Sequence, residues 1–141
     1  MIDESLFDNT EGVELTKHAL PKADVDEAMR NVPSWVPDEY REFFDHFCDF
    51  IAPGFVLFSP VYPPAYFYNI DTGYKTFQET LEVLGFDPER WFPVGHFDGF
   101  SYAVYHLNDD GTMEFGAYDF TDQDYFEGPF GSFVEWMEAQ A

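Results

Sequence analysis

The stretch SYAVYHLNDDGTMEFGAY, residues 101–118, carries the strongest signal for the fold. Apolar and polar residues roughly alternate over 101–107 and again over 112–118, as they do in strands with one buried face. The connecting residues 108–111 end in Asp-Gly, a dipeptide typical of tight hairpin turns. The sequence therefore predicts a β-hairpin here, and the apolar run 91–95 predicts a further strand just before it.

Two helices are predicted in the first third of the chain. Segment 24–30 indicates a short helix with Asp24 as its N-cap. Segment 37–51 indicates a longer helix, because Pro37 suits a first helical turn and apolar residues then recur on one face. The Pro-Gly pair at 53–54 is expected to end it.

Two more helices are predicted on either side of the strand region. One begins near Asp71 and ends at Gly85, a favourable C-cap. The last begins after Ser132, with Glu135 three residues later as in a capping box. Because the strands are grouped rather than alternating with helices, the predicted class is α+β.

The remaining segments are predicted as short strands and loops. Residues 55–58 form a strand candidate, and residues 65–68 an edge strand that follows a proline-rich loop. Residues 119–128 are expected to form an acidic loop.

The predicted core consists of apolar residues that share one face of these elements. They are Tyr40, Phe43, Phe44, Phe47, Leu57, Phe77, Leu81, Leu84, Val104, Phe115, Phe133 and Met137.

Length and composition predict one folded domain. A chain of 141 residues is about one domain long. Its 21% aromatic content excludes disorder of the whole, and a single cysteine, Cys48, excludes a disulfide scaffold. Residues 1–20 are expected to be a loosely ordered arm and residues 21–141 the domain. The acidic start and the lack of an apolar run of about 20 residues give no sign of export or of a membrane span, so the expected location is cytoplasmic.

Net charge excludes whole classes of partner. The chain has 28 Asp or Glu against 6 Lys or Arg, a net charge of -22. DNA, RNA and anionic membranes are bound through Lys and Arg, so none of them is an expected partner. No Lys or Arg follows Arg90. An acidic surface of this kind serves either solubility or the docking of a basic partner.

No residue pattern predicts catalysis, a cofactor or a metal site. The four histidines lack the spacing of a zinc site. Asp119, Asp122, Asp124 and Glu127 lie close in sequence, but the glycine of a calcium-binding loop is misplaced. Cys48 lies on the predicted apolar helix face, where a thiol is inert. We therefore expect a non-catalytic binding module, with a metal-dependent enzyme as the least favoured alternative.

Several short motifs, in this order and spacing, resemble the SUKH superfamily, which includes fungal cell-wall-synthesis regulators and many bacterial immunity proteins. The matching residues are 36–43, 92–95, 98–102 and 132–137. The resemblance implies an α+β domain with a mixed or antiparallel sheet packed by helices, and no catalysis. For compact bacterial members it implies neutralisation of a cognate toxin, often a nuclease. The alternative is a regulatory or scaffold module of the same fold.

The predicted partner-binding residues are carboxylates in a stretch without Lys or Arg that includes a hairpin tip and a loop, where binding residues tend to lie. They are Asp109, Asp110, Asp119, Asp122, Asp124 and Glu127. Tyr62 and Tyr66 are a second choice, because a loop stiffened by proline loses little entropy on binding. The alternative is that these tyrosines only pack.

Overall fold

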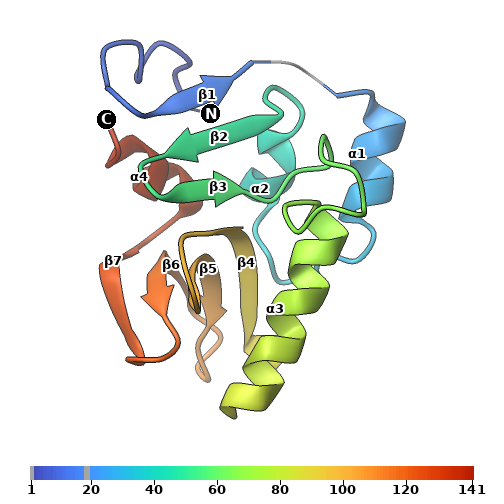
Figure 1. Ribbon diagram of the computed structural model, residues 1–141, viewed down its shortest axis with the longest axis vertical. Helices are drawn as coiled ribbons and strands as arrows, with labels where there is room; N and C mark the ends of the chain where they lie inside the picture. The colour runs from blue at the N-terminus through green and yellow to red at the C-terminus, as the bar shows by residue number, and fades with distance from the viewer. Residues whose placement is uncertain (1, 18–19) are drawn as a thin grey trace.

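In the computed structural model, which describes residues 2–17 and 20–141, seven strands form one antiparallel sheet in the order in which they occur in the chain. Figure 1 shows the first three strands crossing the upper half of the molecule and the other four running down the lower half. The strands are β1 (Glu14–Thr16), β2 (Asp49–Ala52), β3 (Phe55–Leu57), β4 (Trp91–His96), β5 (Ser101–Leu107), β6 (Met113–Asp119) and β7 (Asp124–Phe130).

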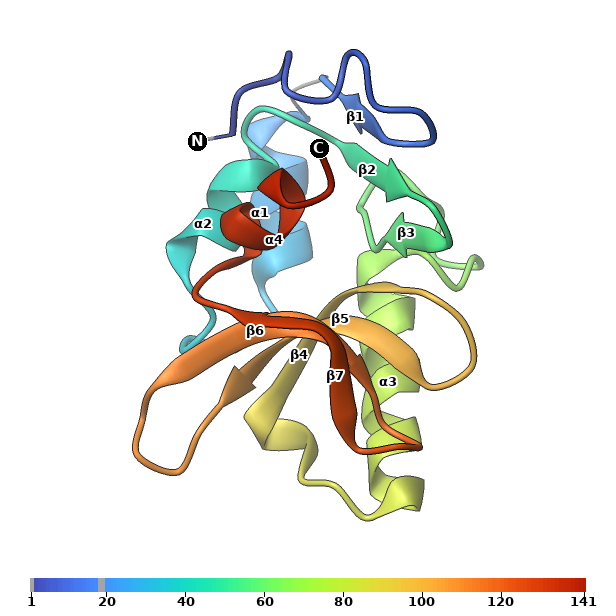
Figure 2. The ribbon, with the colours of Figure 1, turned by 90° about the vertical axis from the view of Figure 1, so that its left-hand side faces the viewer.

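Helices pack against two sides of this sheet. Figure 2 shows α3 lying along β4–β7, while α1, α2 and α4 gather above these strands. The described helices are α1 (Lys22–Met29), α2 (Asp38–Phe43), α3 (Ile70–Leu84) and α4 (Phe133–Glu138), with one turn of 3-10 helix at Pro88–Arg90.

Strand β5 separates two apolar clusters. Tyr102 and Val104 pack with residues of α3, whereas Ala103 and Tyr105 pack with residues of α1, α2 and α4. Successive side chains of a strand point to opposite faces, so β5 is buried on both sides. The predicted α+β class is therefore confirmed, with a purely antiparallel sheet.

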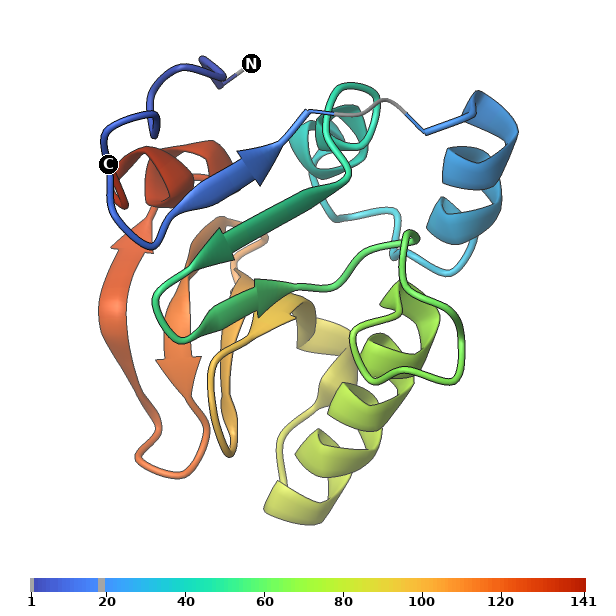
Figure 3. The ribbon, with the colours of Figure 1, turned by 45° about the horizontal axis from the view of Figure 1, so that its top comes forward.

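The sheet changes direction between β3 and β4, and Gly95 lies at that junction (Figure 3). It pairs with Leu57 of β3, next to an irregularity in the pairing of β4 with β5. A Cβ at Gly95 would lie 2.3 Å from Cζ of Phe55 and 2.6 Å from the carbonyl oxygen of Val56. The close approach of β3 therefore requires glycine here.

The predicted hairpin is confirmed. Ser101 pairs with Asp119 and Leu107 with Met113, around a turn at 108–111. The strands predicted at 55–58 and 91–95 are present as β3 and β4.

The two later helices are also confirmed. α3 ends at Gly85 in the left-handed conformation (φ 85°), and Asn69 caps its start by accepting from the backbone N–H groups of Asp71 and Thr72. For α4, the Ser132 hydroxyl oxygen accepts from the N–H of Glu135 at 3.1 Å.

The predicted helix over 37–51 is wrong in its second half. α2 ends at Phe43, and β2 begins at Asp49. Phe50 is fully buried while its neighbour Ile51 is 36% exposed, which is the alternation of a strand. Apolar residues at 43, 47 and 50–51 fit a helix face, but pairing with β1 and β3 satisfies the backbone of β2 instead.

Two loop and strand assignments are also wrong. Residues 119–128, expected to be a loop, include most of β7, whose Tyr125 pairs with Tyr118 of β6 at a ring separation of 4.9 Å. Such cross-strand aromatic pairs stabilise strand pairing. Residues 65–68, expected to be an edge strand, form turns instead: the N–H of Tyr66 donates to the carbonyl of Pro63.

The N-terminal segment is part of the fold over residues 2–17. Leu15 of β1 pairs with Phe50, and Ile2 and Phe7 are buried, so the expected loose arm is not found there. Residues 1 and 18–19 lie outside the described residues.

Two single-residue expectations are also corrected. α1 begins at Lys22, and Asp24 makes no capping hydrogen bond; it lies in the first turn, where its charge complements the helix dipole. Of the predicted core, Leu84 is only half-buried; the other members are buried.

Candidate functional site

The acidic residues predicted to bind a partner lie in three separate places: the β5–β6 turn, the β6–β7 turn and, for Glu127, the middle of β7. Asp109 and Asp110 occupy the β5–β6 turn, whereas Asp119, Asp122 and Asp124 surround the β6–β7 turn. β6 is seven residues long, so these two turns are about 20 Å apart along the strand. Figure 2 shows them at opposite ends of the strands, and they cannot form one compact site.

The β5–β6 turn uses its carboxylates locally. Asp110 accepts hydrogen bonds from the Thr112 hydroxyl at 2.6 Å and from its backbone N–H at 2.9 Å. These hydrogen bonds lower the pKa of Asp110 from its ordinary value. Asp109 lies 3.4 Å from the Arg90 guanidinium. The hydrogen bonds to Asp110 hold the turn together, and the contact of Asp109 links it to the 3-10 turn at Pro88–Arg90.

Glu127 has a structural role that the sequence did not indicate. Its Oε1 atom accepts from the Trp136 indole N–H at 3.2 Å, and its Oε2 atom accepts from the Gln140 side chain at 3.4 Å. Trp136 is fully buried, so its N–H needs a partner. Glu127 therefore joins β7 to α4 and its following turn.

The β6–β7 turn forms one wall of a hollow, which we call the acidic pocket. Its volume is about 450 Å³. The opposite wall is the β4–β5 turn, which is held in place by the N–H of Phe120 donating to the carbonyl of Phe100 at 3.1 Å. The pocket is lined by Phe97, Asp98, Ser101, Asp119, Asp122, Asp124, Tyr125 and Phe126.

Four carboxylate residues therefore line a space whose lining contains no Lys, Arg or His. Asp122 and Asp124 are exposed, and Asp119 is half-buried. Oδ1 of Asp119 accepts from the backbone N–H of Thr121 at 2.8 Å, which fixes its side chain at the base of the turn. The pocket is therefore suited to positively charged groups.

The acidic pocket also has an aromatic wall. The rings of Phe97 and Phe126 pack edge to face with their centroids 5.0 Å apart. The centroid of the Phe97 ring is also 5.0 Å from that of Phe55 in the core. Phe126 is 52% exposed. A cationic side chain can stack on an exposed ring while its charge meets a carboxylate, so the wall adds a second mode of recognition.

Sequence reasoning missed five members of this pocket: Phe97, Asp98, Ser101, Tyr125 and Phe126. Asp98 lies in the β4–β5 turn, and only the pairing of β5 with β6 brings that turn beside Asp119. The exposure of Phe126 depends on β7, which the sequence did not predict. Thus Asp119, Asp122 and Asp124 remain candidate binding residues with new neighbours.

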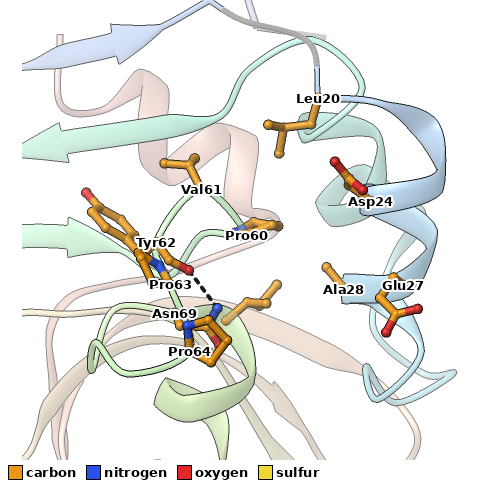
Figure 4. Close-up of a pocket in the computed structure, with 11 residues that line it drawn as sticks. Leu20, Asp24, Glu27, Ala28, Pro60, Val61, Tyr62, Pro63, Pro64 and Asn69 are labelled. Carbon is orange, nitrogen blue, oxygen red and sulfur yellow. Dashed lines mark hydrogen bonds between the residues drawn. The ribbon is translucent and has the colours of Figure 1, made fainter.

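Tyr62 lies in a different hollow, the proline-loop pocket, between residues 60–64 and α1 (Figure 4). Its volume is about 310 Å³. The Tyr62 hydroxyl donates to Oδ2 of Asp49 at 2.8 Å, and burial raises the pKa of Tyr62 to about 12. Burial likewise raises the pKa of Asp49. This hydroxyl therefore anchors the loop to β2.

Tyr66 does not line the proline-loop pocket and is 60% exposed. Tyr62 and Tyr66 thus belong to different parts of the surface, and neither lines the acidic pocket. Glu27 and Asp24 line the α1 side of the proline-loop pocket, but Glu27 already pairs with Arg30.

Comparisons with known proteins and the arrangement of possible metal ligands in the described residues identify no further site. A scan of family models, a search of curated proteins and a search of solved structures each found no match. In residues 2–17 and 20–141, no group of three or more His, Cys, Asp or Glu is arranged to hold a metal ion. Within the same residues, no helix has the length and apolar character needed to cross a bilayer.

Charge repulsion predicts that salt stabilises the protein. With 28 carboxylate side chains and 6 Lys or Arg, most carboxylates have no Lys or Arg to pair with. Raising NaCl from 0.01 to 0.15 M shortens the screening length from about 30 Å to about 8 Å. We expect the thermal midpoint to rise, by about 4 °C for each kcal/mol of repulsion relieved. Differential scanning calorimetry across this range measures it, and a flat or falling midpoint would contradict the expectation.

Proposed function

We propose that this chain is a non-catalytic protein-binding domain whose acidic pocket receives a basic surface of its partner. The observation that carries the proposal is that Asp98, Asp119, Asp122 and Asp124 line one pocket beside an exposed aromatic wall. Charged rims around apolar contacts are typical of protein interfaces. Opposite charge accelerates encounter with the right partner and disfavours wrong ones.

The specific role that we propose is that of an immunity protein, which neutralises a cognate toxin inside the cell that produces the immunity protein. The motif resemblance to the SUKH superfamily supports this assignment, and an antiparallel α+β domain is compatible with it. A nuclease toxin has a basic substrate-binding surface because it must hold phosphates. An acidic inhibitor with a net charge of -22 complements such a surface.

The binding test first identifies a toxin domain encoded beside this gene and then measures its association with the protein. Replacing Asp119, Asp122 and Asp124 together by Asn removes three charges and keeps the oxygen atoms that accept backbone hydrogen bonds. We expect association at low salt to slow by about ten-fold and its salt dependence to flatten. Stopped-flow fluorescence at several NaCl concentrations measures both.

A matched control removes the same three charges elsewhere. Glu11→Gln, Asp45→Asn and Glu138→Gln are all at exposed positions away from the acidic pocket. If both triple variants slow association equally, only the net charge matters and the pocket is not the binding site. If the wild-type protein neither binds the toxin domain nor inhibits it, the immunity role is rejected in favour of a regulatory or scaffold module.

A further inference from the structure

An apolar groove runs along the outer face of α3, which we call the α3 groove. Its volume is about 210 Å³, and it is lined by Thr76, Glu79, Thr80, Val83, Leu84 and Phe100. Two of its apolar side chains are strongly exposed: Val83 at 86% and Phe100 at 45%. Exposed apolar residues that adjoin one another often mark an interaction surface.

The α3 residues of this groove form one stripe along the helix, of which Glu79 and Val83 are exposed and the others half-buried. Positions 76, 79, 80 and 83 follow helical spacing and lie on one face. Phe77 and Leu81, on a different face of α3, pack fully buried against the sheet. Val83 belongs to neither apolar cluster, and it has neither the charge nor the helix propensity usual at an exposed helix position.

Phe100 is held outward by the geometry of the β4–β5 turn. The N–H of Ser101 donates to the carbonyl of Asp98 at 2.9 Å, and the N–H of Phe97 donates to the carbonyl of Ser101 at 3.0 Å. The carbonyl of Phe100 accepts from Phe120. Within the described residues, Phe100 belongs to neither apolar cluster. Its ring is therefore presented to solvent on a fixed turn.

The same turn joins the α3 groove to the acidic pocket. Phe97 and Asp98 line the pocket, while Phe100 lines the groove. Glu79 lies within the groove, and Glu82 is an exposed neighbour on α3; Lys75 is the single basic residue of that helix. The apolar groove is thus bordered mainly by carboxylates.

We propose that the α3 groove is the apolar centre of the docking surface and that its occupant is an amphipathic segment of a basic partner protein. An apolar side chain of the partner lies between Val83 and Phe100, and its Lys or Arg side chains meet the carboxylates of the acidic pocket. This inference rests on the basic partner of the proposed function. A second copy of the chain is disfavoured because it brings the same net charge of -22.

The test uses two synthetic peptides of about 18 residues, or five helical turns. Both contain the same Leu, Lys and Arg residues; in one they are arranged as an amphipathic helix, and in the other they are scrambled. Isothermal titration calorimetry at 0.15 M NaCl measures affinity, and nuclear magnetic resonance shifts locate the site. We expect the amphipathic peptide to bind at least about ten-fold more tightly and to shift Thr80, Val83 and Phe100.

Variants separate the groove from general charge attraction. Val83→Ser with Phe100→Ser should abolish the preference for the amphipathic peptide without changing the fold, since both side chains are exposed. Val61→Ser is the matched control, because Val61 is 42% exposed but lines the proline-loop pocket. It should leave the preference intact.

Three results would overturn the inference. Equal affinity for both peptides would show that charge alone attracts them. The proposed function would still stand in that case if the toxin domain binds through the acidic pocket. Shifts confined to the proline-loop pocket would place the docking surface there. A dimer of the wild-type protein in analytical ultracentrifugation, lost in the Val83→Ser, Phe100→Ser variant, would make a second copy the occupant.

Discussion

Replacing Phe133 by Ala is expected to lower the free energy of unfolding by about 3–5 kcal/mol. Phe133 is fully buried at the start of α4. Its ring lies 5.6 Å from Phe43 of α2 and 5.4 Å from Phe115 of β6. Truncation would leave a cavity where two helices and the sheet meet, and the rigid rings around it cannot close the space.

Urea denaturation followed by tryptophan fluorescence measures this change. Val83→Ala is the control, because that side chain is 86% exposed and its loss should change stability by no more than about 0.5 kcal/mol. Should Phe133→Ala unfold at the same urea concentration as the wild type, the packing of α4 on α2 and the sheet would be wrong.

The second large effect is expected at Gly95. Replacing it by Ala should lower the free energy of unfolding by about 1–3 kcal/mol through overpacking. The new Cβ would meet the backbone oxygen of Val56 at 2.6 Å, as well as the Phe55 ring. That ring is itself confined by Trp136 at 4.9 Å, so it has little room to move. Relief therefore requires β3 to move away from β4.

Amide hydrogen exchange shows where the change acts. In the Gly95→Ala protein, protection should fall at the β3–β4 pairing and stay closer to that of the wild type in the β5–β6 hairpin. Gly131→Ala is the control, since its Cβ would meet only the flexible side chain of Glu135, at 3.3 Å. If the Gly95→Ala and Gly131→Ala proteins were both as stable as the wild type, β3 could not approach Gly95 as closely as the structure shows.

Much of the fold follows from local sequence signals, and the errors have identifiable physical causes. The β5–β6 hairpin and α3 have strong turn and cap residues, Asp110-Gly111 and Gly85, which act within a few residues of chain. β2 was missed because its apolar residues continue the period of α2, and only the neighbouring strands select the extended form. β7 was missed because the acidic residues up to Gly128 indicated a loop, although an edge strand tolerates both this glycine and the Pro129 that follows it.

The candidate site was predicted less well than the fold, for a related reason. Residues close in sequence, such as Asp110 and Asp119, were expected to act together, but β6 carries them to opposite ends of a strand. Asp98 and Asp119 are distant in sequence and meet through strand pairing. The role of Glu127 depends on Trp136, nine residues later, which only the packing of α4 brings within reach.

The order of strands in the sheet also bears on how the chain folds. β4 to β7 are joined by short connections at 97–100, 108–112 and 120–123, whereas β3 and β4 are separated by residues 58–90. Closing a short loop loses less chain entropy than closing a long one, so we expect the C-terminal hairpins to nucleate folding and β1–β3 to dock later. No Lys or Arg follows Arg90, and the nucleus therefore has to assemble against its own negative charge. Ionic strength should accordingly govern how fast this protein folds as well as how stable it becomes.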